Sequence, residues 1–279
     1  MFIAHDVELG CLISVDEALD GGSGSYVCPV CGEAVIVKNG SLVIPHFAHK
    51  SKTDCDTFTQ DMSAWHKWWQ NRFPKANQEH VEELQISVRD YHRAAIQNNF
   101  WRSTVDDLIS RHQMDEVITI KHRADVRVYG YVIEFQNSPI SKEEFNERNW
   151  FYRAIGCKVV WIFNFIDIYK ENRMFCYEEV SNKYNGGKYK WKRASKTFAD
   201  FAPQDHKTRK EDDEWVESDI LLFFQIAQVC DDEDGIGYIE QVVWAPINDY
   251  DEVSYHTFHT SYKITTATEL CEIIRKRHL

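Results

Sequence analysis

The sequence lacks several features that would assign it quickly to a common class of protein. Its 279 residues contain no long apolar segment and no signal peptide, which predicts a cytoplasmic protein without a membrane anchor. It has no internal repeat, coiled-coil heptad or glycine-rich phosphate loop, which argues against repeat architectures and P-loop nucleotide binding. It also lacks positive charge overall: the formal net charge is -12 at pH 7, which is unfavourable for nucleic-acid binding unless basic residues are concentrated in one region.

Aromatic residues and cysteines, by contrast, are plentiful. The 9 Trp and 13 Tyr predict an ample ordered core, and the length allows one sizeable domain with a smaller one. The 8 cysteines, without a secretion signal, are expected to be reduced thiols. Five of them are scattered along the chain and are interpreted as packing residues: Cys11, Cys157, Cys176, Cys230 and Cys271.

The other three cysteines form a Cys/His pattern near the amino terminus. Cys28 and Cys31 make a CxxC pair, which places two thiolates on one tight turn. The remaining ligands of a tetrahedral zinc would come from His46, His49 and Cys55, and the spacing leaves one histidine undecided. Four protein ligands leave no open position for water, so we predict a structural zinc. A redox CxxC pair or free buried cysteines are the alternative interpretation.

The most informative pattern lies further along the chain. Two runs of alternating residues flank Tyr129 and Gly130, which predicts a hairpin with a two-residue loop. In that register Asp125 faces Glu134, and Gln136 shares their face because side chains i and i+2 point the same way. Opposed carboxylates repel unless a cation lies between them, and oxygen ligands suit Mg²⁺ or Mn²⁺. The pattern predicts a catalytic metal site; an ordinary exposed hairpin is the alternative.

The segment after this hairpin predicts the fold class. Ser141 and Glu144 have the spacing of a capping box, and Gly156 is a suitable residue to end the helix. The apolar run 157–163 then reads as a buried strand. The order strand, strand, helix, strand predicts an α/β (α+β) protein whose mixed sheet has a crossover helix.

These motifs together resemble the competence protein CoiA-like nuclease family, which belongs to the restriction-endonuclease-like PD-(D/E)XK class. The resemblance rests on HRADV, VIEFQNSPIS and WIFN and on the order CPxCG, HFAH, C upstream, and it runs to about Phe163. It implies a restriction-endonuclease-like mixed sheet flanked by helices, with a small zinc-ribbon-like amino-terminal module. The family motif falls on Asp125, Glu134 and Gln136, where many relatives in the wider class have lysine in place of this glutamine.

The resemblance also implies further residues of a catalytic site. A SxxH-type helix, here at about 61–73 with a stripe of tryptophans, makes His66 a candidate for phosphate contact or metal assistance; a structural histidine is the alternative. An upstream glutamate is expected as well. Glu83 is favoured because relatives place an acid at this distance after the helix, and Glu82 and Glu116 are the other candidates.

Three domains are predicted: an amino-terminal zinc-binding module at 1–58, a nuclease core at 59–178 with an insertion at about 90–115, and a carboxy-terminal extension at 179–279 that packs on the core. Within the extension, residues 183–196 include six Lys or Arg and no acid, which is typical of a segment that contacts the phosphate backbone of a nucleic acid. The candidate DNA contacts are Arg123, Lys188, Lys190, Lys192 and Arg193.

The function predicted from the sequence is Mg²⁺- or Mn²⁺-dependent hydrolysis of DNA phosphodiester bonds by a cytoplasmic deoxyribonuclease, with endonuclease activity expected, that serves competence, defence or repair. A homodimer is compatible with this prediction. Two rival functions remain: a catalytically weak, zinc-containing DNA-binding module, and a zinc-stabilised protein-interaction domain. The complete acid, acid, amide set favours the enzyme, whereas the net acidity favours the interaction domain.

Overall fold

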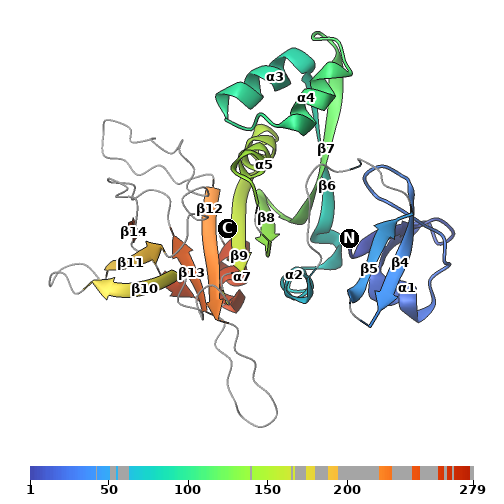
Figure 1. Cartoon of the computed structure of the whole chain (residues 1–279). Helices are drawn as coiled ribbons and strands as arrows, with labels where there is room; N and C mark the ends of the chain where they lie inside the picture. The colour runs from blue at the N-terminus through green and yellow to red at the C-terminus, as the bar shows by residue number, and fades with distance from the viewer. Residues whose placement is uncertain are drawn as a thin grey trace. The chain divides into compact units, whose positions relative to one another are not determined.

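The computed structural model describes residues 1–41, 43–50, 55, 63–138, 140–164 and 166, and beyond them six strands and one helix (Figure 1). The chain divides into two compact units, Met1–Val128 and Tyr129–Leu279. None of the helices in these described parts reaches the length and apolarity that crossing a bilayer requires.

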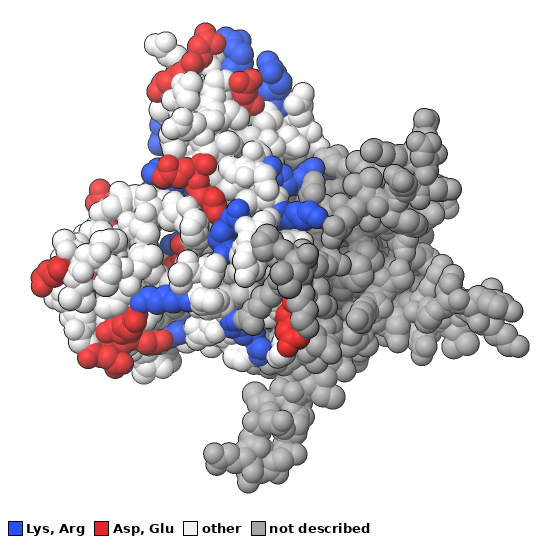
Figure 2. All heavy atoms as spheres, turned by 180° about the vertical axis from the view of Figure 1, so that it is seen from behind, with Lys and Arg blue, Asp and Glu red and all other residues white. Residues whose placement is uncertain are grey.

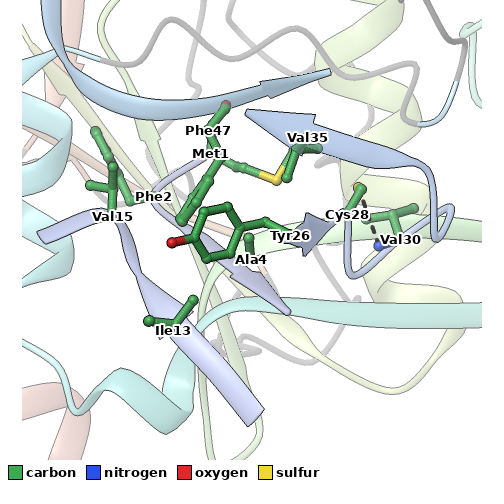
Figure 3. Close-up of a cluster of buried hydrophobic side chains, with 10 residues drawn as sticks. All are labelled: Met1, Phe2, Ala4, Ile13, Val15, Tyr26, Cys28, Val30, Val35 and Phe47. Atoms are coloured by element: carbon green, nitrogen blue, oxygen red, sulfur yellow. Dashed lines mark hydrogen bonds between the residues drawn. The ribbon is translucent and has the colours of Figure 1, made fainter. Parts of the chain in front are cut away.

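The first unit begins with an antiparallel sheet in the order β2-β1-β3-β4-β5. Its elements are β1 (Ile3–Asp6), β2 (Cys11–Ser14), α1 (Val15–Gly21), β3 (Tyr26–Val27), β4 (Ala34–Gly40) and β5 (Val43–His49). Helix α1 begins with a complete capping box between Ser14 and Glu17. The hydrophobic core of this module includes the side chains of Met1, Phe2 and Cys28, which lie beside those of Tyr26 and Phe47 (Figure 3).

A long two-stranded ladder forms the rest of the first unit. Its elements are α2 (Ala64–Gln70), the 3-10 helix η1 (Lys75–Asn77), β6 (Gln78–Ser87), α3 (Val88–Gln97), α4 (Ser103–Ser110) and β7 (Val117–Val128). Strands β6 and β7 pair antiparallel along nearly their whole length. The segment expected to be an insertion, about 90–115, holds most of α3 and all of α4, and it connects the two strands at one end of the ladder (Figure 1).

A mixed sheet is the main part of the second unit, which confirms the predicted α+β class. Strands β8 (Tyr131–Gln136) and β9 (Lys158–Asn164) are parallel, and α5 (Lys142–Ala154) connects them. Strand β12 (Ile220–Ala227) continues the sheet parallel to β9, and β13 (Gln241–Ala245) and β15 (Lys263–Thr265) follow antiparallel. Helix α7 (Ala267–Lys276) comes last, and β10 (Met174–Glu179), β11 (Lys188–Arg193) and β14 (Thr257–Thr260) form a separate antiparallel sheet.

The start of helix α5 agrees with the sequence prediction except for the capping box. The Ser141 side chain accepts a hydrogen bond from the backbone N–H of Glu144 at 3.1 Å, as an N-cap should. The Glu144 carboxylate, however, binds Arg148 rather than completing a capping box. The helix ends at Ala154 with Ile155 as its C-cap, and the following Gly156 has a φ of +81°, the left-handed conformation that glycine adopts most easily.

The turn between β7 and β8 has the predicted length. Strand β7 ends at Val128 and β8 begins at Tyr131, so Tyr129 and Gly130 are the two connecting residues. Tyr129 has a positive φ of +52°. A bulky residue in this conformation is uncommon, so the turn has a conformational cost.

The carboxy-terminal part contributes strand β12 to the same sheet as β9. Because β12 pairs directly with β9, the sheet continues across the boundary predicted at 178/179. Lys188 and Arg193 are the two ends of β11, with Lys190 and Lys192 between them, and their side chains lie outside the described residues, as do 183–187 and 194–196.

Candidate functional site

A cluster of metal-ligating side chains lies at the edge of the amino-terminal module. The ligand atoms of Cys28, Cys31, His49 and Cys55 all lie within 4.8 Å of one another, and this is the one such group among the described residues. Cys28 Sγ is 3.9 Å from Cys55 Sγ, and Cys31 Sγ is 3.4 Å from His49 Nε2. Three thiols and one imidazole in this arrangement could hold a metal ion.

The local backbone explains why the two cysteines of CxxC converge. Gly32 N donates to Cys28 O at 2.9 Å, and Cys28 N donates to Glu33 O at 2.8 Å, which closes a tight turn. Gly32 has a φ of +76° and supplies the left-handed residue that this turn needs. Val30 N points at Cys28 Sγ from 3.4 Å, so the backbone also favours negative charge on that sulfur.

Strand parity decides which histidine joins the cluster. His46 and His49 are three residues apart on β5, so their side chains point to opposite faces of the strand. His49 shares its face with the buried Phe47, whereas His46 turns away and its Nδ1 lies 2.9 Å from Ile44 O. The structure therefore selects His49 from the two predicted candidates.

The pKa values of the three thiols shift in different directions. The pKa of Cys28 is lowered to about 4, chiefly by a hydrogen bond from Cys55, so Cys28 is the thiolate of the group. Burial raises the pKa of Cys31, and the hydrogen bond that Cys55 donates to Cys28 raises the pKa of Cys55. A bound cation would offset the cost of bringing the other two thiolates close together.

The second group of interest centres on Asp125 in β7. Its carboxylate is buried, at 1% exposure, and Oδ1 lies 3.0 Å from His66 Nε2. His66 stands in the first turn of α2, where Ser63 Oγ caps its backbone N–H at 3.1 Å. The SxxH spacing thus has a physical basis, because the serine that starts the helix fixes the turn that presents the histidine.

Helix α2 holds Asp125 at a second point. Gln70 is one turn beyond His66 on the same face, and its Nε2 donates to the backbone oxygen of Asp125 at 3.3 Å. Gln78 Nε2 in turn donates to Gln70 O and to Phe73 O, which fixes the end of α2 against the start of β6. His66 and Gln70 therefore position the side chain and the main chain of Asp125 together.

In the second unit, Glu134 on β8 has a buried cationic partner. Glu134 is fully buried, and its Oε2 accepts a hydrogen bond from Arg148 Nη1 at 2.6 Å. Arg148 Nη2 donates to Glu144 Oε1, also at 2.6 Å, so one guanidinium bridges two carboxylates. Burial works against the charge on Arg148, but Glu134 and Glu144 outweigh it and raise the Arg148 pKa, so this residue remains a cation.

Replacing Arg148 with lysine should test this bridge. A single ammonium cannot reproduce two hydrogen bonds with the geometry of the guanidinium fork, so Arg148→Lys should lower the free energy of unfolding by about 2 kcal/mol. Denaturant unfolding monitored by circular dichroism measures the change. Arg153→Lys, at a residue that is exposed near the end of the same helix, is the control and should change stability little. Equal stability of the two variants would contradict the bridging role.

The other predicted residues lie in different surroundings. Gln136 is buried, and its Nε2 donates to Ser138 O at 2.6 Å, so the amide ties down the loop that follows β8. Glu83 is half exposed and pairs with Lys121 on the neighbouring strand at 2.5 Å. Glu116 pairs with His112 at an exposed site, and Glu82 pairs with Arg127. The assignment of the upstream acid to any of these three glutamates stays a prediction.

One buried acid escaped the sequence analysis. Glu79 is 4% exposed, and Gln78 and His80 on either side pair with Val126 and Ala124, so Glu79 stands opposite Asp125 in the ladder. The sequence analysis considered only Glu82, Glu83 and Glu116 as the upstream acid. It did not consider Glu79, because the register that places Glu79 opposite Asp125 is not fixed by the local sequence.

Arg123, predicted to contact DNA, lies beside this acid. Its side chain is largely buried, with Nε 3.9 Å from Glu79 Oε2. On the face drawn in Figure 2, basic and acidic side chains lie close to one another at several places. The contact of Arg123 with DNA stays a prediction.

Two family models match this chain. The model described as the N-terminal domain of competence protein CoiA matches residues 16–58, which include the whole Cys/His cluster. The model described as the nuclease-like domain of competence protein CoiA matches residues 113–205, which include Asp125, Glu134 and Arg148. Residues 59–112, with His66 and Glu79, lie between the two matches. No curated protein and no solved structure matches the chain.

Proposed function

Since this chain belongs to the CoiA-like competence protein family, we propose that it is a metal-dependent nuclease that hydrolyses phosphodiester bonds of DNA. The observation that carries the proposal is the burial of Asp125 and Glu134, two carboxylates inside the range that is similar to the nuclease-like domain. Charged carboxylates are almost never fully buried without partners or a metal. Here each has a nitrogen partner that fixes its direction, which is the preparation that a catalytic site requires.

The donor set fits a hard divalent cation. Carboxylate oxygens are the ligands that Mg²⁺ and Mn²⁺ prefer. Asp125 belongs to the first unit and Glu134 to the second, and only Tyr129 and Gly130 separate their strands, so the sequence predicts that the two acids face each other. A metal bound by them would lower the pKa of a water ligand and neutralise charge on the phosphate.

The surrounding side chains support these two acids in different ways. His66 and Gln70 orient Asp125 from α2, and Arg148 orients Glu134 from α5. Gln136 carries no charge and its amide is committed to Ser138 O, so it does not supply the cation that lysine supplies in many relatives. The site therefore relies strongly on its metal for neutralising the phosphate.

For the Cys/His cluster we propose a structural zinc. Three thiolates and His49 complete a tetrahedral set, which leaves no open position for water or substrate. The metal would hold the CxxC turn against the end of β5 and Cys55. This closes the amino-terminal module without a disulfide.

Incubation with DNA tests the proposed activity. Purified protein is mixed with plasmid and with single-stranded DNA in Mg²⁺, in Mn²⁺ or in EDTA, and the products are separated by electrophoresis. We expect cleavage with Mg²⁺ or Mn²⁺ and none in EDTA, because the acids alone cannot activate water or neutralise the phosphate.

The same samples distinguish the rival functions. DNA that is bound but never cut, in any metal, would contradict the nuclease and support a DNA-binding module that uses the basic segment 183–196. An absence of DNA binding at moderate salt would support a protein-interaction domain instead. A gel-shift measurement in parallel with the cleavage experiment provides this comparison.

A further inference from the structure

We propose that Glu79 is a positioning residue that fixes strand β1 of the metal-binding module against the Asp125 strand and thereby holds the Phe2 ring against His66. The inference rests on the proposed nuclease function and deepens it, because it makes the amino-terminal module part of the frame of the catalytic site. Within the first unit, one buried carboxylate joins elements that lie 76 and 77 residues apart in the chain.

The conformation of Glu79 is the first observation. Its φ is +48°, a left-handed conformation that non-glycine residues rarely adopt, and it stands at the ladder position opposite Asp125. Strain of this kind persists only where the surrounding structure imposes it, and it is concentrated at functional sites. The backbone turns at this point, and the carboxylate is buried rather than directed to solvent.

The contacts of the carboxylate are the second observation. Glu79 Oε1 accepts a hydrogen bond from the backbone N–H of Phe2 at 2.5 Å, and Oε2 accepts one from that of Ile3 at 3.2 Å. Arg123 Nε lies 3.9 Å from Oε2 and supplies a positive charge. Charge-assisted hydrogen bonds to backbone N–H groups are stronger than neutral ones, so this anchor is well suited to hold a strand in place.

Phe2 connects the Glu79 anchor to the pair formed by His66 and Asp125. The Phe2 ring is buried and meets the His66 imidazole edge-on, with ring centroids 6.2 Å apart. Two surface ion pairs, Lys67 with Asp16 and Lys75 with Glu17, join α1 to the segment around α2. Exposed ion pairs contribute little stability, so of these polar links the buried Glu79 anchor constrains Phe2 most strongly, in addition to the packing of Phe2 in the core of the module.

The variants are Glu79→Gln, Phe2→Leu and, as a matched control, Asp16→Asn. Glutamine keeps the size of Glu79 but presents an NH₂ group to one of two N–H donors, so it cannot hold both. Phe2→Leu keeps the backbone N–H that Glu79 binds and removes only the ring. Asp16→Asn removes an exposed link between the same two parts of the protein.

Two measurements are made on the full chain at a temperature at which circular dichroism shows every variant folded. Steady-state cleavage of DNA separates kcat from KM. Heteronuclear NMR of protein with ¹³C-labelled histidine reports the His66 ring, whose signals are assigned with His66→Gln. We expect Glu79→Gln to lower kcat roughly 10- to 100-fold with little change in KM, and to shift the His66 signals. Phe2→Leu should shift the same signals, and Asp16→Asn should change neither quantity.

The proposal is overturned if Glu79→Gln lowers the melting temperature but leaves kcat and the His66 signals as in the wild type. Glu79 would then be a stabilising residue only. Unchanged His66 signals in Phe2→Leu would overturn it as well. If the wild type cleaves no DNA, the proposed nuclease fails separately, and the His66 signals still decide whether Glu79 and Phe2 position that histidine.

Discussion

Asp125→Asn should reduce metal-dependent DNA cleavage by about a thousandfold. The substitution keeps the shape of the side chain and removes one negative charge from the proposed metal site, and the loss of a catalytic metal is worth several kcal/mol of activation free energy. Glu134→Gln should have a comparable effect, because the amide oxygen can still accept from Arg148 while the charge is lost. Initial rates of plasmid cleavage over a series of Mn²⁺ concentrations provide the measurement.

Asp115→Asn is the matched control for this prediction. Asp115 is 86% exposed and pairs with Arg89 at the surface of the same unit, so its replacement should leave the rate unchanged. DNA binding by Asp125→Asn should persist, because the substitution removes negative charge. Cleavage by Asp125→Asn at the wild-type rate would place the catalytic site elsewhere in the chain.

Cys31→Ser should abolish zinc binding and strongly destabilise the amino-terminal module. Cys31 is exposed, so its replacement changes packing little and tests the metal itself. Structural zinc contributes about 10 kcal/mol or more of apparent binding free energy, which becomes folding free energy when the site forms only in the folded state. We expect one zinc per chain in the wild type, none in the variant, and a much lower melting temperature of the module.

Cys11→Ser is the control, because Cys11 is also exposed in the same module and lies outside the cluster. Acid should mimic Cys31→Ser. The raised pKa values of Cys31 and Cys55 mean that metal binding must displace their protons, so zinc affinity falls as the pH falls. Zinc content by mass spectrometry and thermal unfolding provide the measurements. Full zinc occupancy in Cys31→Ser would refute the assignment of this ligand.

Local spacing was sufficient to predict part of this architecture. The turn at 129–130, the start of α5 after Ser141 and its end before Gly156 were predicted correctly, because each depends on a few neighbouring residues. The metal cluster was predicted except for the choice between His46 and His49. That choice depends on which face of β5 meets the core, and a strand with apolar residues on both faces does not reveal this from its sequence.

Contacts between distant segments could not be predicted in the same way. The bridge from Arg148 to Glu134 depends on how α5 crosses the sheet, and spacing along the chain does not determine that crossing. Glu79 was missed because its left-handed backbone has no signature in a glutamate. The carboxy-terminal extension was expected to pack on the core, and the pairing of β12 with β9 could not be predicted, because an apolar run is compatible with several arrangements.

The pairing of β9 with β12 has a consequence for how this protein is made. All five residues from Val159 to Phe163 are buried, and one of the two edges of β9 is completed only by β12. Between Asn164 and Ile220 lie 55 residues (165 to 219), so a ribosome adding about 5 to 20 residues per second needs roughly 3 to 11 seconds to cross the gap. During that time an apolar strand edge on the nascent chain is unpaired and open to other chains. Synthesis of this protein therefore passes through an aggregation-prone stage that ends only when β12 has left the ribosome.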